Sequence, residues 1–469
     1  GQENPLQNPE VKKLLQQAAK DNIPVNYMVR ALDLAKQGYE LPLQEFDTHY
    51  ESEAYLTVSG QNSNNSIRIP NEFFKALDEG REWNLTARRS GEVMETMPAS
   101  KLWDDIGYCA WASADPGLQY NTTINEWHTC PEDGPINGSN PCSEYMFLDD
   151  TACNLASINL VKFYTPEQGF DIEGYRHAIR LWTTTLEISV LMAQFPSDPI
   201  AIKSFQFRTL GLGYANLGTL LMLQGIPYDS EEGRVYAGAM AAIMTGDSYA
   251  TSAEMASILG PFQMYEKNKE HMLKVIRNHK RAAYNNTDYE QLEVLPQSID
   301  QEICPKALLE TAHDAWDKAL SLGEKYGYRN AQTTVLAPTG TIGLVMDCDT
   351  TGVEPDYAIV KFKKLAGGGF FKIVNSSVPG ALRKLGYSEF EIDSIIKYCL
   401  GRASLNGSPH INAQTLSAKG ITGEAIVNIE KQLGSNMDIR HVLNQWTIGE
   451  DLYNQLMQGK EGDLLEILG

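Results

Sequence analysis

Apolar residues recur three and four positions apart over long parts of this chain, which is the spacing of an amphipathic helix. Residues 8–37 carry two short patterns of this kind, separated near Asn22-Ile23-Pro24. Further helical patterns cover 99–113, most of 170–330, and several short stretches of 378–469. These patterns predict a chain that is largely helical.

A few short runs instead have the composition and alternation of strands. Ser66-Ile67-Arg68-Ile69 alternates and precedes Pro70 and a helical pattern at 72–77. Residues 331–337 are typical of a buried strand that runs into the turn PTGTIG, and another strand is expected at 370–372 after a flexible turn at 367–369. Since helices alternate with isolated buried strands, the predicted class is α/β.

Composition and charge narrow the possible functions. The 469 residues carry a formal charge of −21, which argues against a nucleic-acid coat protein and against a binder of anionic membranes. The chain has no apolar run near the ~20 residues that a membrane span needs, and we expect a cytoplasmic protein. A nucleotide can still bind locally through backbone amides.

The seven cysteines are scattered, and none forms a CxxC pair. This spacing disfavours both a disulfide framework and a structural zinc site. The eight histidines form no metal-binding pair, Asp149-Asp150 has no further ligand at useful spacing, and no metal site is predicted. His128, beside Cys130, is interpreted as a residue of a loop without a functional role.

Asn140-Pro141-Cys142-Ser143-Glu144 is the most informative segment for chemistry. If it is extended, Asn140, Cys142 and Glu144 point the same way and place a thiol between an amide and a carboxylate. A buried cysteine is more often a small apolar residue than a reactive one, but two polar neighbours on its face would be costly without a task. Cys153 follows eleven residues later, and by itself it could equally be a core residue.

The turn at 337–343, APTGTIG, offers glycine, two threonine hydroxyls and the expected start of a helix. Backbone amides at such a start can hold an anion, although PTG alone is more often a plain turn. Gly211-Leu212-Gly213-Tyr214-Ala215-Asn216-Leu217-Gly218 has some of the glycines of a dinucleotide fingerprint, but its third glycine is misplaced. We interpret that segment as a site of close helix packing.

The longer strings NPCSEYMFLDDTACNLASINL and AQTTVLAPTGTIGLVMDCDTTGVEPD closely resemble adenosylcobalamin-dependent (class II) ribonucleotide reductases. The resemblance implies the central part of a ten-stranded α/β barrel, with the catalytic cysteine on a central finger loop. It implies a helical lead-in at 1–50 and a partial barrel with helical insertions at 51–469, and both ends of the barrel are expected outside this chain.

The same resemblance implies roles for single residues. Cys142 would form a thiyl radical, Glu144 would act as a base, Asn140 would hold the ribose, and Cys153 would belong to a redox pair. The other cysteine of that pair is expected upstream of Gly1. The residues expected to bind the substrate phosphates are Thr339, Gly340, Thr341 and Ile342.

Cofactor and partners also follow only from the resemblance. Adenosylcobalamin is expected, although the Asp-x-His-x-x-Gly signature of histidine-ligated cobalamin is absent from the sequence. The expected substrate is a ribonucleotide, with diphosphates favoured, and the expected reductant is a protein of the thioredoxin or glutaredoxin type. Complementary reductase segments or a homodimer are possible partners.

Two alternatives stay open at this point. One is a fragment of a class I reductase, whose radical comes from a partner protein. The other is a scaffold that completes a partner's barrel without catalysis, which would have no need of Asn140, Cys142 and Glu144 together.

Overall fold

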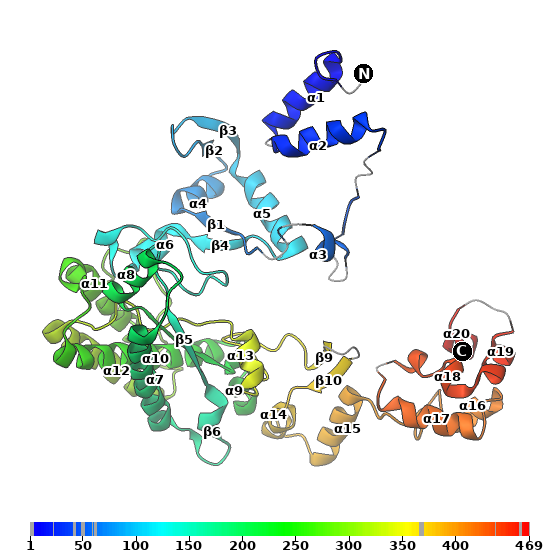
Figure 1. Cartoon of the computed structure of the whole chain (residues 1–469). Helices are drawn as coiled ribbons and strands as arrows, with labels where there is room; N and C mark the ends of the chain where they lie inside the picture. Colours follow the sequence, from blue (N-terminus) through cyan, green and yellow to red (C-terminus); the bar gives the residue numbers. More distant parts are fainter. Residues whose placement is uncertain are drawn as a thin grey trace. The chain divides into compact units, whose positions relative to one another are not determined.

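The computed structural model forms two compact units, Gly1–Ile67 with Ala76–Gly117, and Arg68–Lys75 with Leu118–Gly469 (Figure 1). The structure describes residues 4–21, 23–40, 44–47, 52–58, 60, 63–364, 370–436, 438–458 and 462–468. In these ranges, no helix combines the length and the apolar character needed to cross a bilayer.

The first unit contains the two predicted N-terminal helices, α1 (Pro9–Lys20) and α2 (Val25–Lys36). α1 begins where the Asn8 side chain accepts hydrogen bonds from the amides of Glu10 and Val11, an N-cap that satisfies two amides of the first turn. The unit also contains α3 (Ala54–Thr57), the antiparallel pair β2 (Glu82–Thr86) and β3 (Val93–Pro98), and α5 (Ala99–Ser113). The predicted helix at 99–113 is therefore confirmed.

The predicted strand and helix around Pro70 are confirmed as β1 (Ser66–Ile69) and α4 (Asn71–Asp78). β1 pairs with β4 (Gly117–Tyr120), which leads into α6 (Asn121–Glu126). Pro70 ends the strand because it lacks an amide hydrogen for the ladder, and the helix starts directly after it.

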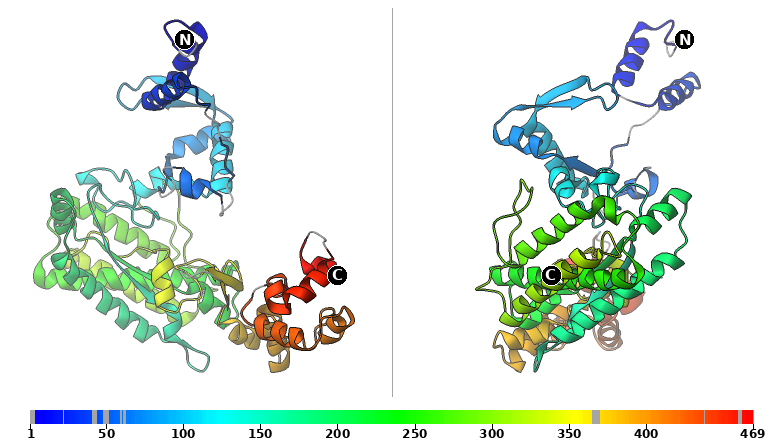
Figure 2. Two further views of the ribbon diagram at one scale, coloured as in Figure 1. Left: turned by 45° about the vertical axis from the view of Figure 1, so that its right-hand side comes forward. Right: turned by 90° about the vertical axis from the view of Figure 1, so that its left-hand side faces the viewer.

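The core of the second unit surrounds a parallel strand pair, β5 (Asn154–Asn159) and β8 (Leu210–Ala215). Around this pair lie α7 (Ile172–Met192), α10 (Glu231–Leu259), α11 (Tyr265–Ala283) and α12 (Lys306–Tyr326), with the shorter α8 (Asp198–Phe207), and Figure 2 shows the long helices from two further sides. The prediction of mostly helical structure over 170–330 is thus confirmed, apart from β8.

The segment at 331–337 runs along β8 but forms little regular strand. The amides of Leu210 and Leu212 donate to the carbonyls of Gln332 (2.8 Å) and Thr333 (3.1 Å), and Leu212 and Thr334 form an isolated parallel bridge. Alternate residues of the segment are buried. The predicted extended and buried character is confirmed, whereas the regular strand is limited to that single bridge.

The interpretation of Gly211–Gly218 as a helix-packing segment is wrong for its first half, which is the fully buried strand β8. A Cβ atom on Gly213 would lie 2.3 Å from the carbonyl oxygen of Val335, and one on Gly211 would lie 2.6 Å from Leu155 Cδ2. The glycines therefore serve close packing between neighbouring extended segments. Asn216, at φ 72°, then turns the chain into α9 (Leu217–Gln224).

After the short helix α13 (Gly340–Val345), the chain forms the antiparallel pair β9 (Val360–Lys364) and β10 (Phe370–Val374). The strand expected at 370–372 is confirmed, and the turn expected at 367–369 lies outside the described residues. Short helices follow, as predicted: α14 (Val378–Lys384), α15 (Glu389–Leu400), α16 (Ala413–Ala418), α17 (Glu424–Leu433), α18 (Gln445–Ile448), α19 (Glu450–Met457) and α20 (Leu464–Leu468). Those from α16 onward share a small apolar core of their own.

The strands of the described residues form five two-stranded sheets and no closed barrel. Mixed helix and strand content agrees with the predicted α/β class. The ten-stranded barrel with its finger loop, and the division at residue 50, remain predictions.

Candidate active site

The segment around Cys142 is a tight turn, so the prediction that it is extended is wrong. The amide of Ser143 donates to the carbonyl of Asn140 (3.1 Å), and Ser143 has a φ of 64°. Asn140 followed by Pro141 is a favourable start for such a turn, because proline already has the φ that its second position requires. Cys142 consequently lies at the exposed tip, and it does not share one face of a strand with its neighbours.

Asn140 and Tyr145 close the base of this turn. The Tyr145 amide donates to Asn140 Oδ1 (2.9 Å), and the Asn140 amide donates to the Tyr145 carbonyl (3.4 Å). The side-chain oxygen of Asn140 is therefore used by the turn itself. The side-chain NH₂ group of Asn140 is what remains available to bind a substrate.

Glu144 lies close to Cys153. Burial is the main cause that raises the pKa of the Cys153 thiol to about 12, and the negative charge of Glu144 adds to it. One carboxylate oxygen of Glu144, Oε2, is buried and has no hydrogen-bond partner within the described chain. A buried acceptor without a donor is costly, which makes Glu144 suited to accept a hydrogen bond or a proton from a bound molecule.

A pocket of about 450 Å³ joins the turn to the segment before β5. Its lining includes Asn140, Tyr145, Phe147 and Cys153. The structure thus brings Asn140 and Cys153 to one pocket, with Glu144 near Cys153, while the Cys142 thiol lies on the exposed tip. Asp149 and Asp150 also line it, and no cluster of three potential metal ligands occurs in the described part of the chain.

Tyr145 is a site residue that the sequence analysis missed. Its buried phenol lies 3.0 Å from the hydroxyl of Thr151 and 3.0 Å from that of Thr209, and Thr209 in turn donates to the carbonyl of Ala152 (2.6 Å). Burial raises the pKa of Tyr145, which keeps the phenol protonated. The only sequence signal was an aromatic residue directly after Glu144.

His128 lies in a loop, as interpreted, and it has a structural role there. It is 2% exposed; its Nδ1 accepts from the amide of Cys130 (3.3 Å) and its Nε2 contacts the carbonyl of Gly134 (3.1 Å). This arrangement requires a neutral ring, and burial lowers the pKa of His128 to about 4. The histidine fixes the loop that leads towards the Cys142 turn.

The predicted phosphate-binding residues lie at the start of α13, which confirms that a helix follows the PTG turn. The Thr339 hydroxyl donates to the carbonyl of Pro338 (2.7 Å) and accepts from the amide of Gly352 (2.7 Å). This side chain is therefore committed to shaping the loop. Gly340, Thr341 and Ile342 are exposed, and amides in the first turn of a helix have no acceptor within the helix.

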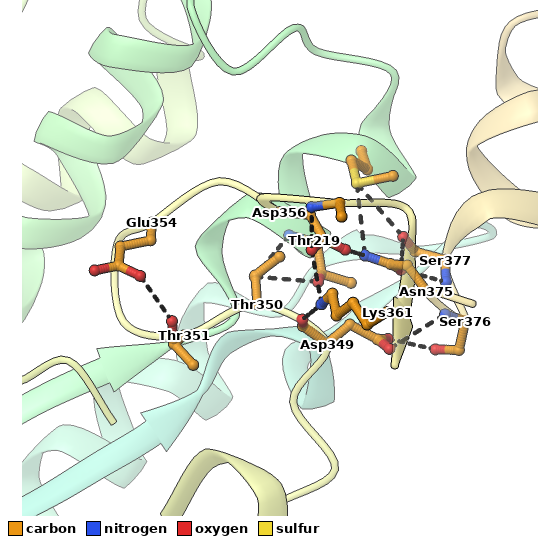
Figure 3. A network of polar contacts seen from close by, with 12 residues as sticks. Thr219, Asp349, Thr350, Thr351, Glu354, Asp356, Lys361, Asn375, Ser376 and Ser377 are labelled. Atoms are coloured by element: carbon orange, nitrogen blue, oxygen red, sulfur yellow. Dashed lines mark hydrogen bonds and ion pairs between the residues drawn. The ribbon is translucent and has the colours of Figure 1, made fainter. Parts of the chain in front are cut away.

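A polar network holds the chain that follows α13 (Figure 3). Lys361 forms an ion pair with Asp356 (2.7 Å) and donates to the carbonyl of Asp349 (2.8 Å), while Asn375 donates to Asp356 (2.6 Å). Thr350 accepts from the amide of Thr219 at the start of α9 (3.1 Å). These contacts hold the loop at 349–356, which follows α13, against the start of α9 and against β9 and the residue after β10.

The two candidate groups lie at opposite ends of the strand pair. Cys153 precedes the amino end of β5, whereas 339–342 follow a segment that runs parallel to β8 and leave at its carboxyl end. At about 3.3 Å per residue, the six residues of β5 span roughly 20 Å. A substrate whose phosphates are bound by residues 339–342 can meet Cys142 only if the Cys142 turn extends from the amino end of the strand pair towards its carboxyl end.

Comparison with known proteins agrees with these features. Residues 35–418 match the family described as "Ribonucleotide reductase, barrel domain". The chain is 57% identical to the vitamin B12-dependent ribonucleotide reductase of Bradyrhizobium diazoefficiens, with 99% of this chain and 38% of the relative covered. It is also 57% identical to the vitamin B12-dependent ribonucleotide reductase of Agrobacterium fabrum, with 99% of this chain and 37% of the relative covered.

A more distant relative is the vitamin B12-dependent ribonucleoside-diphosphate reductase of Thermoplasma acidophilum, 27% identical over 77% of this chain and 40% of its own length. The chain spans less than two fifths of the length of the first two relatives. Because the family match extends over most of its residues, this chain belongs to the ribonucleotide reductase barrel-domain family.

Proposed function

We propose that this chain carries catalytic residues of a vitamin B12-dependent ribonucleotide reductase, which converts ribonucleotides to 2′-deoxyribonucleotides for DNA synthesis. The observation that carries the proposal is the Cys142 turn, which presents an exposed thiol two residues before Glu144 and adjoins the pocket that Asn140 and Cys153 line. The names of the relatives support the B12-dependent class over a class I reductase. A pure scaffold would not need a buried, unpaired carboxylate oxygen beside a thiol.

In the proposed reaction, a Cys142 thiyl radical removes the hydrogen atom from C3′ of the ribose. Glu144 takes the proton of the 3′-hydroxyl, and its unpaired Oε2 supports this role. The C2′–O bond then breaks and the hydroxyl leaves as water. Two thiols, one of them Cys153, supply two electrons and two protons and end as a disulfide. Glu144 then returns its proton to the 3′-oxygen, and Cys142 returns the hydrogen atom to C3′.

Asn140 positions the ribose through its side-chain NH₂ group, because its side-chain oxygen already accepts from Tyr145. The raised pKa of Cys153 suits its role, since a neutral thiol holds the hydrogen that reduction consumes.

The exposure of Cys142 fits adenosylcobalamin, a bulky group that must reach the sulfur from outside the turn. When bound, this cofactor would supply the radical that Cys142 receives. His128 is not available to cobalt, because both of its ring nitrogens are engaged within its loop. The chain's own contribution at this point is the hydrogen-bonded turn that presents the thiol.

We propose that the backbone amides of Gly340, Thr341 and Ile342 bind the substrate phosphates, as amides at a helix start favour anions. Thr339 contributes by shaping the loop, in keeping with its two internal hydrogen bonds. Diphosphates are the proposed substrates, which the name of the Thermoplasma relative supports.

The remaining proposals concern the setting of the chain. Residues 51–469 would form the central part of a ten-stranded barrel with Cys142 on its finger loop, and 1–50 a helical lead-in. A protein of the thioredoxin or glutaredoxin type would re-reduce the site in the cytoplasm. A homodimer or complementary reductase segments would complete the assembly.

Growth complementation tests the function. The gene that encodes this chain is introduced, together with the complementary reductase segments and with cobalamin, into a host without a ribonucleotide reductase of its own. We expect growth with the natural sequence and none with Cys142→Ala, while Cys109→Ala, which removes another exposed thiol, should grow normally. Growth with Cys142→Ala would exclude the proposed chemistry.

A further inference from the structure

A second pocket, of about 390 Å³, lies on the other side of Phe147 from the candidate active site. Phe147 lines both pockets, and Met146 beside it lines only the second. The other walls come from α6, α10 and α11 and from the extended segment at 332–334. A molecule in this pocket would therefore touch the chain two residues after Glu144.

The lining has an unusual chemical character, being aromatic and polar but without formal charge. Tyr120, Trp127, Phe147 and Tyr249 contribute aromatic rings, and no Asp, Glu, Lys or Arg is among the described residues that line it. Its two histidines, His128 and His279, are neutral near pH 7, because burial lowers the pKa of each to about 4. Such walls favour a flat, uncharged ring and disfavour a phosphate.

The pocket also contains unused hydrogen-bonding capacity. The side-chain oxygen of Gln332 is buried and has no partner in the described chain. The hydroxyls of Thr245 and Thr334 lie 3.0 Å apart, so one hydrogen serves the contact and the other is left for a ligand. The acceptor and the donor thus belong to residues that line a space walled by aromatic rings, the usual composition of a small-molecule site.

We infer that this pocket binds an uncharged heteroaromatic molecule about the size of a purine base, with a ring N–H or amino group that donates to Gln332. A volume near the lower end of the range for ligand pockets suits a single fused ring better than a whole nucleotide. The inference is independent of the reductase proposal, since none of the four residues assigned to radical chemistry supplies the recognition.

Adenine is a suitable probe, and titration calorimetry of the folded protein at pH 7.5 is the measurement. We expect saturable binding of adenine, and at least tenfold weaker binding of naphthalene, which has the same flat shape but no N–H group. Gln332→Met keeps the length of the side chain and removes the acceptor, so it should weaken adenine binding at least tenfold. Gln224→Met, a change of the same kind outside the pocket, should leave it unaltered.

Three results would overturn the inference: no saturable adenine binding, equal binding of naphthalene, or displacement of adenine by cytidine diphosphate, which would place it in the substrate site. If Gln332→Met does not fold, Thr245→Val and the naphthalene comparison on the natural protein still decide the matter. Adenine binding that Thr245→Val and Gln332→Met both leave unchanged would also exclude this pocket.

Discussion

The phenol of Tyr145 lies 3.0 Å from the hydroxyl of Thr209, and this contact connects the Cys142 turn to the residue immediately before β8. Thr209 also donates to Ala152, next to Cys153, and Tyr145 contacts Thr151 as well. The buried Tyr145 oxygen thus joins the turn to Thr151, six residues later, and to Thr209, 64 residues later. The position of Glu144 relative to Cys153 depends on this junction.

Tyr145→Phe should therefore loosen the candidate site while leaving the core packed. We expect a loss of about 1–2 kcal/mol in the free energy of unfolding, the cost of removing a buried hydrogen-bond partner, measured by urea denaturation. Tyr228→Phe removes an exposed phenol that donates to Val353 (2.6 Å) and should cost less than about 0.5 kcal/mol. Equal losses from the two changes would argue against the junction.

The cysteines should differ widely in reactivity. With iodoacetamide at pH 8, we expect the exposed Cys109 and Cys142 to be alkylated first, and the fully buried Cys130 last. Burial raises the pKa of Cys130 to about 12, so almost none of its thiol is in the reactive thiolate form. Peptide mass spectrometry over time gives the order, and Cys142→Ser should remove one fast site. Early labelling of Cys130 in folded protein would contradict the structure.

Stability should fall as the pH falls from about 6.5 to about 4. His128 and His279 have folded pKa values of about 4, below the ordinary value of 6.5, because both rings are buried. The unfolded chain then binds more protons than the folded one within this window, so acid favours unfolding, and the stabilisation is complete above pH 6.5. Urea unfolding at several pH values measures the slope, which His128→Gln should reduce. A slope unaffected by that change would refute the assignment to His128.

Glu187 should be among the charged residues whose substitution lowers the stability of the fold most. It is 4% exposed and accepts from Arg208 (2.7 Å), Arg329 (2.7 Å) and Asn330 (2.7 Å). Glu187→Gln leaves the buried guanidinium of Arg208 and the half-buried one of Arg329 without their counter-charge, and we expect a loss of roughly 3–5 kcal/mol in thermal or urea unfolding. Glu254→Gln, which removes the exposed partner of Arg180, should cost less than about 1 kcal/mol. A small effect at Glu187 would mean that water already compensates the charges.

Gly213→Ala should separate β8 from the segment beside it. The added methyl group would lie 2.3 Å from the backbone oxygen of Val335, which cannot move without breaking the contact between the two segments. We expect a loss above about 2 kcal/mol or failure to fold, read from thermal unfolding. Gly107→Ala, in α5 with no atom within 4 Å of the new Cβ, should be neutral or stabilise by up to about 1 kcal/mol. Equal tolerance at both positions would contradict the packing of β8.

Local patterns in the sequence were sufficient where short-range forces dominate. The helix at 99–113, the strand and helix on either side of Pro70, and the paired helices of the N-terminal region were predicted because apolar spacing, caps and proline act within a few residues. The family resemblance likewise followed from contiguous residues around Cys142 and Thr339, and the family match confirms it.

Tertiary structure decided the features that depend on distant segments. β8 is a strand because Gly211 and Gly213 allow Leu155 and Val335 to approach it, and no local pattern contains that information. The turn at Cys142 closes because Asn140 bonds Tyr145, whose phenol is held by Thr151 and Thr209. The sequence by itself determined which residues can perform chemistry, whereas packing between remote segments determined which of them meet, because hydrogen bonds and close contacts form only between groups that the fold brings within a few ångströms.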